Sequence, residues 1–271
     1  MTKDKILATD TPFDLRALFL TPVVDGSLVQ QTIRRLTEAI GIGLLQGRER
    51  LPAEPELAEL LDIAPMTLRE ALAVMRRAGY LETVRGRTGG TFIAQISTPS
   101  KEAARQRLES IDAGFLRDLS DYRRAISVQA AALASERATE TEILGLERQV
   151  VRIRAAETFV EYLQLDAQFH IAIAASSGAT RLWREQIRVE METGGITLAA
   201  AAQPSRFHPD LMMDHDALVQ AIRDRDPVRA RAVTAAHINR GCEALIELCL
   251  GHGHTTDPSE NDGKTSGGAD A

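Results

Sequence analysis

The sequence predicts a mainly α-helical protein, in which a small N-terminal domain with a β-hairpin precedes an antiparallel, all-helical bundle. Apolar residues recur at helical spacing over most of residues 28–250. Two short segments rich in β-favouring residues lie close together within residues 81–93. Aromatic residues make up only 4% of the 271-residue chain, so its cores are built mainly from aliphatic side chains, which suits helix packing. A chain of this length is long enough for two such domains.

The first third of the chain contains the elements of a winged helix-turn-helix. An amphipathic helix is predicted at residues 28–45 and a short helix at 54–61. A second helix of the motif is predicted at 65–78, with a proline at its first position. A hairpin, the small β wing, is predicted from residues 81–84 and 91–93, which flank an Arg- and Gly-rich turn. Helix, short helix, turn, helix and hairpin is the order of a winged helix-turn-helix, a motif that reads DNA.

The charge of the chain permits a nucleic-acid partner without indicating one. The formal net charge is −6, which does not by itself favour binding to DNA. Residues 21–95 contain nine Arg, no Lys and nine Asp or Glu, so this segment is neutral and the acidity lies elsewhere. A neutral segment can still bind DNA if its arginines share one face.

The chain shows no sign of a membrane or disulfide-stabilised protein. No apolar run approaches the roughly 20 residues that span a bilayer, and the first residues lack the apolar segment of a secretory signal. Cys242 and Cys249 lie in one predicted helix, about 10 Å apart along its axis, too far to form a disulfide. We therefore expect a cytoplasmic protein with no membrane partner.

Composition divides the chain into five parts. Residues 1–20 have no clear pattern and are predicted to be a flexible arm. Residues 21–95 form the predicted DNA-binding domain, and the polar residues 96–107 form a linker. Residues 108–252 form the helical domain, and the Gly-, Ser- and Asp-rich residues 253–271 are predicted to be disordered.

Six helices with short loops are predicted in the helical domain. They are expected at residues 111–136, 140–157, 159–177, 181–194, 211–224 and 227–250. Glycines mark several of the expected breaks, among them the pair Gly194-Gly195. An antiparallel bundle of this kind has an interior that can hold a ligand or a metal ion.

Four side chains of this domain suggest a metal site. Asp166 and His170 lie four residues apart on one helical face, where both can reach a single cation. Their neighbours are apolar, so the pair points toward a core. His215 and His237 follow on helical patterns, and together the four supply three imidazoles and one carboxylate, donors that suit Zn²⁺ or Ni²⁺. Any one of these histidines alone would be better explained as an ordinary core residue.

Four motifs within residues 28–94 carry a family resemblance. They read Gly43-Leu44-Leu45-Gln46-Gly47, Leu51-Pro52-Ala53-Glu54, Leu57-Ala58-Glu59-Leu60-Leu61 and Thr67-Leu68-Arg69-Glu70-Ala71-Leu72. This segment resembles the DNA-binding domain of GntR-family transcription regulators.

The resemblance implies a set of DNA contacts in the second helix of the motif and in the wing. The implied residues are Thr67, Arg69, Arg85, Arg87 and Gly89. Arg69 is expected to touch a base edge or a phosphate, and Thr67 the DNA backbone. Pro55 and Pro65 stand where the family often has arginines, so the resemblance implies DNA binding but does not indicate the operator sequence. Two plainer interpretations stay open, in which Arg69 pairs with a nearby Glu, and Arg76 and Arg77 are solvated charges at the helix end.

The helical half carries a second resemblance. Its motif residues are Asp166, Gln168-Phe169-His170, Ile173-Ala174 and Ser176, followed by His215 and by Ala236-His237-Ile238. They resemble the FCD effector-binding domain of the FadR subgroup. The resemblance implies that the carboxylate and the three histidines bind a divalent metal ion, and that Arg123 binds the carboxylate of an organic acid. A salt bridge on the helix surface stays open as the alternative interpretation of Arg123. Ser127 stands where the family often has a glutamate.

Together the two resemblances imply a DNA-binding transcription regulator, in this family more often a repressor than an activator. The expected partners are pseudo-palindromic operator DNA, a second copy of the chain in a homodimer, and a small organic-acid effector. One alternative is a metalloenzyme with an attached DNA-binding head, but the sequence has no H-E-x-x-H motif, so no enzymatic role is expected. The other alternative is a regulator whose signal is the metal ion itself.

Overall fold

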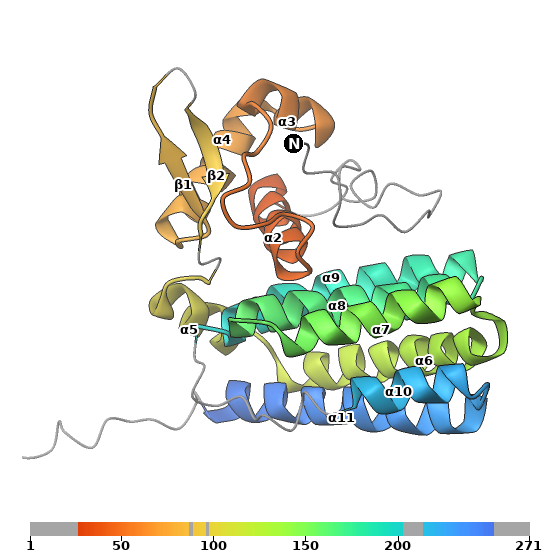
Figure 1. Cartoon of the computed structure of the whole chain (residues 1–271). Helices are drawn as coiled ribbons and strands as arrows, with labels where there is room; N and C mark the ends of the chain where they lie inside the picture. The colour runs from red at the N-terminus through yellow and green to blue at the C-terminus, as the bar shows by residue number, and fades with distance from the viewer. Residues whose placement is uncertain (1–26, 87–88, 96–97, 203–213, 252–271) are drawn as a thin grey trace, which may run out of the picture.

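The structure, a computed structural model, describes residues 27–86, 89–95, 98–202 and 214–251 (Figure 1). The predicted flexible arm and disordered tail lie outside these residues. The described chain is mainly helical, with one two-stranded antiparallel sheet near its start and a helical bundle after it. The predicted fold class is therefore confirmed.

The N-terminal head is a winged helix-turn-helix. It comprises α2 (Leu28–Gly41), α3 (Glu54–Leu60), α4 (Pro65–Arg77), β1 (Leu81–Val84) and β2 (Gly90–Ile93). A proline lies in the first turn of both α3 and α4, where the missing N–H costs no hydrogen bond. The strands pair with Leu81 opposite Ile93 and Val84 opposite Gly90. The hairpin thus forms the wing beside α4.

The first helix is shorter than predicted, because it ends at Gly41 rather than at residue 45. Gly43 has a φ of 71°, in the left-handed region that glycine tolerates and that ends a helix. Leu44 and Leu45 follow in a non-helical turn, yet both are buried. Their apolar spacing therefore reflects burial, which periodicity alone does not distinguish from a continuing helix.

The C-terminal domain is the predicted bundle. Its helices are α6 (Ala113–Arg137), α7 (Glu140–Arg154), α8 (Phe159–Ser176), α9 (Thr180–Ala200), α10 (His215–Arg223) and α11 (Pro227–Gly251). Side chains of Asp112, Thr139 and Thr158 cap the starts of α6, α7 and α8. Helices α6 and α11 pack along each other, and α8 packs against α6, α7 and α9. In Figure 1 the head lies over α8 and α9, whereas α6, α10 and α11 form the far side. The expected start of α10 at residue 211 lies outside the described residues.

The break predicted at Gly194-Gly195 is wrong, since α9 continues through both glycines to Ala200. The two residues lie where α2 crosses α9. A Cβ on Gly194 would lie 2.9 Å from the side chain of Ile42, and a Cβ on Gly41 would lie 2.4 Å from the backbone of Gly194. The glycines therefore permit a close approach of two helices, which a local reading of the sequence mistakes for a loop.

The predicted linker, residues 96–107, is partly wrong as well, because it contains most of a helix, α5 (Lys101–Glu109). Ser100 begins this helix by accepting a hydrogen bond from the N–H of Ala103. Ala104 and Leu108 are fully buried, and α5 packs against α9. Ala104 and Leu108 are the buried residues of α5, so the composition of this helix is mostly polar and resembles that of a linker.

Head and bundle share one continuous hydrophobic core. Leu36 and Ile40 of α2 belong to the same buried cluster as Ala167 and Ile171 of α8 and Ile187 of α9. Two polar contacts reinforce this packing. Gln164 Nε2 donates to the carbonyl of Ile40 at 2.7 Å, and Gln168 Nε2 donates to that of Ile42 at 3.2 Å, so two side chains of α8 satisfy carbonyls at the end of α2.

A Gly41→Ala substitution should destabilise the protein by about 1–3 kcal/mol, because the added methyl group meets the Gly194 backbone. Chemical denaturation of the full chain measures this loss. Gly145→Ala in α7 is the matched control, since the nearest atom to its new Cβ is a flexible Arg148 nitrogen at 3.9 Å. That variant should gain about 0.5–1 kcal/mol from helix propensity. Equal effects of the two substitutions would contradict the close helix crossing.

Candidate functional site

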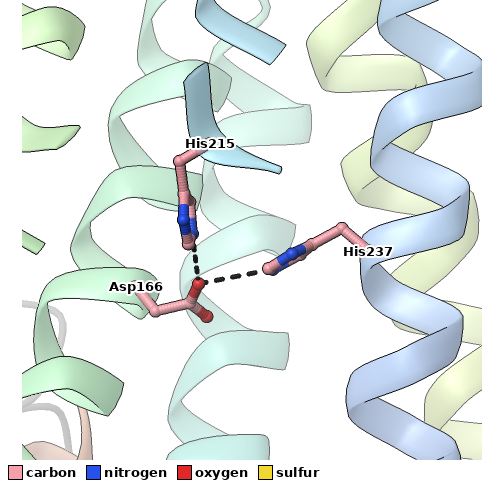
Figure 2. A group of neighbouring side chains, drawn as sticks. All are labelled: Asp166, His215 and His237. Atoms are coloured by element: carbon pink, nitrogen blue, oxygen red, sulfur yellow. Dashed lines mark hydrogen bonds and ion pairs between the residues drawn. The ribbon is translucent and has the colours of Figure 1, made fainter. Parts of the chain in front are cut away.

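The structure brings the four predicted metal ligands together in the interior of the bundle. Asp166 and His170 lie one turn apart in α8, His215 is the first residue of α10, and His237 lies in α11. The three histidine side chains are more than nine-tenths buried, and the side chain of Asp166 is 13% exposed. Figure 2 shows the Asp166 carboxylate between the rings of His215 and His237, which approach it from two other helices. Three helices thus supply one cluster.

The ring nitrogens converge on a single oxygen. Asp166 Oδ1 lies 2.8 Å from His215 Nε2, 3.3 Å from His237 Nε2 and 3.8 Å from His170 Nε2. Ligand atoms of Asp166, His215 and His237 all lie within 4.8 Å of one another. Atoms that each bind one ion at about 2.1 Å lie roughly 3–3.5 Å apart, so the spacing is close to that of a coordination sphere.

His170 stands slightly apart from the other three. Its ring centroid is 5.1 Å from that of His237, but its Nε2 has no hydrogen-bond partner among the described residues. A buried ring nitrogen without a partner is costly and calls for an explanation. A cation at the centre of the cluster would provide that partner, which makes His170 a suitable fourth ligand.

The protonation states also suit a metal ion. Burial lowers the pKa of His170 well below its usual value, although Asp166 opposes the shift, so the imidazole is neutral. Burial pushes the pKa of Asp166 upward, but hydrogen bonds with His215 and His237 hold it well below its usual value. A neutral imidazole and an ionised carboxylate are the forms that coordinate metal ions.

A further carboxylate that the sequence did not single out lies behind His237. Asp214 Oδ2 is 3.7 Å from His237 Nδ1, and the same carboxylate forms an ion pair with Arg240. A carboxylate behind a metal-bound imidazole commonly orients the ring and fixes its tautomer. Asp214 directly precedes His215 in the sequence, which is the one local signal that could have drawn attention to it.

Arg123, the predicted effector residue, lies beside the cluster but is already paired. Its Nε and Nη2 donate to the two carboxylate oxygens of Glu190 in α9, at 3.1 and 3.0 Å. Its Nη2 also lies 3.6 Å from Asp166 Oδ2. Gln186 Nε2 donates to Glu190 Oε1 at 2.7 Å and contacts the hydroxyl of Ser127. Glu190 and Gln186 were missed because a pairing between distant helices leaves no pattern in the sequence.

A cavity of about 50 Å³ adjoins the cluster. Its lining includes Asp166, His237, Arg123, Glu190, Thr193 and Thr197. The space therefore borders the carboxylate, one imidazole, the Arg123–Glu190 pair and two hydroxyls of α9. A small polar ligand in this cavity would lie next to an ion bound in the cluster.

The DNA-contact residues predicted in the head lie on or near its surface. Arg69 is exposed, and its Nε contacts Glu54 Oε2 at 3.0 Å, so it forms the pairing with a nearby Glu that the plainer interpretation predicts. Thr67 is partly exposed in the first turn of α4. Arg85 is exposed after β1, and Gly89 precedes β2. The predicted contact Arg87 lies outside the described residues.

A shallow concavity of about 670 Å³ lies between α3, α4 and the hairpin. Arg50, Arg76 and Arg85 all line it, together with Glu54. Three arginines of the neutral head therefore share one face, which is the arrangement that DNA binding requires. Arg50 was missed as a candidate, although it lies just before the Leu51-Pro52 motif.

Comparison with known proteins identifies both domains. The family model described as "Bacterial regulatory proteins, gntR family" matches residues 28–93, and the FCD domain model matches residues 118–240. The chain is 34% identical to the putative HTH-type transcriptional regulator RmpR of Mycobacterium gastri over 253 residues, 91% of this chain and 90% of that protein.

Other relatives include both a transcriptional repressor and a transcriptional activator. The HTH-type transcriptional repressor NanR of Salmonella schwarzengrund is 25% identical, over 86% of this chain and 90% of that protein. The Glc operon transcriptional activator of Escherichia coli K12 is 31% identical, over 55% of this chain and 59% of that protein. The solved structure of E. coli McbR/YncC shares the fold, with a TM-score of 0.50, 19% identity and coverage of 82% of this chain and 99% of that chain.

These matches agree with the architecture described above. Within the described ranges, every helix is too short or too polar to span a lipid bilayer. The relatives are transcription regulators, which confirms the expectation that the chain is not an enzyme. The chain belongs to the GntR family of DNA-binding transcription regulators and carries an FCD domain behind its winged helix-turn-helix.

Proposed function

We propose that this regulator is a homodimeric repressor whose FCD domain binds one divalent metal ion, Zn²⁺ or Ni²⁺, together with a small organic acid that changes its affinity for operator DNA. The ion is held by the four ligands Asp166, His170, His215 and His237. The observation that carries the proposal is the convergence of three imidazole nitrogens on one carboxylate oxygen. The unpartnered His170 Nε2 supports it, because an ion satisfies that nitrogen.

The donor set also explains how an acid would bind. Three neutral imidazoles and one carboxylate leave a divalent ion with net positive charge, and an ion of five or six coordination keeps positions open. When bound, the ion supplies a positive centre for the effector's carboxylate at the edge of the 50 Å³ cavity. Asp214 would hold the ring of His237 in place behind the ion.

Helix α8 offers a direct route from this site to the head. One face of α8 carries Asp166 and His170, and another carries Gln164 and Gln168, which bind the end of α2. A small displacement of α8 would therefore move α2 and, with it, the DNA-reading elements packed on α2. The protein adopts two conformations that differ in where the head lies on the bundle, and the effector binds one of them more tightly. It thereby sets the spacing of the two heads in a dimer.

The arginine-lined concavity provides the DNA-binding surface. Arg50, Arg76 and Arg85 are positioned to contact phosphates of a pseudo-palindromic operator, and Arg69 exchanges Glu54 for a base edge or phosphate. The assignment as a repressor is supported by NanR, which matches along most of both chains. Genomic footprinting locates the operators, and transcription of the neighbouring genes should rise when the gene for this regulator is deleted. A fall in that transcription would show an activator instead.

Removing one metal ligand should abolish specific metal binding. Asp166→Asn leaves the three imidazoles without their carboxylate, so metal content after dialysis should fall from about one ion per chain to a small fraction. Adding Zn²⁺ or Ni²⁺ at roughly 1,000 times its Kd should stabilise the stripped wild type by about 4 kcal/mol and the variant far less. Asp216→Asn, an exposed carboxylate in α10, is the control and should behave as wild type. A stripped wild-type protein indifferent to metal would contradict the site.

The double variant Gln164→Leu/Gln168→Leu should uncouple the two domains. It keeps the metal ligands, so the acid should still bind, but the acid-induced change in operator Kd should shrink toward onefold from the 5- to 150-fold typical of allosteric coupling. Fluorescence anisotropy on labelled operator, with and without acid, measures the ratio. Gln220→Leu on α10 is the control, because its partner Asp224 lies on the same surface. An unchanged ratio in the double variant would exclude this route, and a response to metal without any acid would make the ion the signal.

Arg50→Ala and Arg85→Ala should each weaken operator binding and reduce the slope of log K against log salt by about 1, because each removes one phosphate contact. Titrations at several salt concentrations measure both effects. Arg152→Ala on the exposed face of α7 should change neither. A salt slope unchanged in both head variants would place the DNA elsewhere on the head.

A further inference from the structure

The arginine expected to grip an effector is occupied by a carboxylate of the protein itself. Glu190 binds Arg123 through two hydrogen bonds, and both side chains are buried. Gln186 donates to the same carboxylate, which anchors Glu190 within α9. Glu190 therefore takes the place at Arg123 that a second carboxylate of an effector would need.

The charges around the cavity limit the charge of the ligand. Burial raises the pKa of Glu190, but its two oxygens accept hydrogen bonds from Arg123 Nε and Nη2 and from Gln186 Nε2, which favour the ionised carboxylate. With Asp166 and Arg123, the charged side chains of the lining then leave one negative charge. The divalent ion of the proposed function turns this into one positive charge. A monoanionic acid brings the buried site to neutrality, whereas a dianion leaves a net negative charge in the interior, which is costly.

The size of the cavity sets a second limit. A volume of about 50 Å³ provides room for on the order of three to five water-sized groups, at roughly 10–15 Å³ each. An acid with a backbone of two or three carbons fills this space. Longer sugar acids would require the surrounding helices to separate.

Two hydroxyls indicate what else the ligand carries. Thr193 Oγ1 donates to the carbonyl of Val189 at 2.7 Å, and Thr197 Oγ1 donates to that of Gly194 at 3.2 Å. Each hydroxyl has thereby used its only proton, and both residues line the cavity. Their oxygens are left as acceptors, which match a ligand with a hydroxyl group to donate.

We propose that the effector is a small hydroxy-monocarboxylic acid, and that Glu190 excludes dicarboxylic acids by occupying Arg123. This inference rests on the proposed metal and acid site and narrows its ligand class. Glu190 is a specificity-determining residue in this arrangement, and Arg123 neutralises charge beside the ion rather than binding the effector.

The test compares lactate with tartronate, which have the same three carbons and the same hydroxyl but differ by one carboxylate. Binding to the metal-loaded full chain is measured by calorimetry and by thermal melting. The wild type should bind lactate at least tenfold more tightly than tartronate, and more tightly than propionate, which lacks the hydroxyl. Equal binding of tartronate, or of propionate, would overturn the corresponding half of the inference.

Glu190→Gln should reverse or abolish the preference for lactate, because it frees Arg123 for a second carboxylate. Glu185→Gln, on the same helix but at the surface, should retain the wild-type preference. The double variant Arg123→Gln/Glu190→Gln keeps the net charge of the site, so it should also retain the preference for lactate. This variant separates an effect of charge from general damage to the site. A single variant that folds and still prefers lactate would refute the role of Glu190. If no carboxylate binds the metal-loaded wild type, the proposed function fails first, and that outcome is distinct from binding without the predicted preference.

Discussion

The bundle depends on the contacts that the carboxylate of Asp166 makes in its interior. The carboxylate contacts His215 of α10 and His237 of α11, lies one turn from His170 of its own helix, and sits beside Arg123 of α6. Through Arg123 it reaches Glu190 of α9. Five of the six bundle helices thus meet at one charge. A buried charge is tolerated only where it is paired and hydrogen-bonded, so the arrangement of these helices is tied to the chemistry of this cluster.

The cluster and the head are linked by short physical steps rather than by a flexible connection. The helix that carries Asp166 also satisfies two carbonyls of α2, and α2 crosses α9 at a glycine contact with no room for a side chain. Close-packed contacts of this kind transmit displacement because they do not compress. The segment expected to be a linker contributes to the same body, since α5 packs against α9.

Apart from α5, the order of the elements could be predicted because helical periodicity, prolines at helix starts and hairpin turns are local signals. The four proposed ligands could be singled out because the Asp166–His170 spacing is local and the family motifs include the other two histidines. Tertiary facts could not be obtained in this way. Gly194 and Gly195 serve a crossing helix, the buried Leu44 and Leu45 continue an apolar pattern after α2 has ended, and Glu190 meets Arg123 across 67 residues of sequence. Each of these depends on a partner from elsewhere in the chain.

The continuous core between head and bundle has a consequence for how such regulators diversify. Leu36 and Ile40 of α2 are buried against side chains of α8 and α9, so a recombination point near residue 95 would divide a single hydrophobic core. A head acquired from another regulator would bring its own α2 surface to an α9 shaped for this one. New pairings of DNA target and effector therefore require the exchange of α2 together with its contacts on α8 and α9. The head and its interface with α8 and α9 are therefore expected to be exchanged together during evolution.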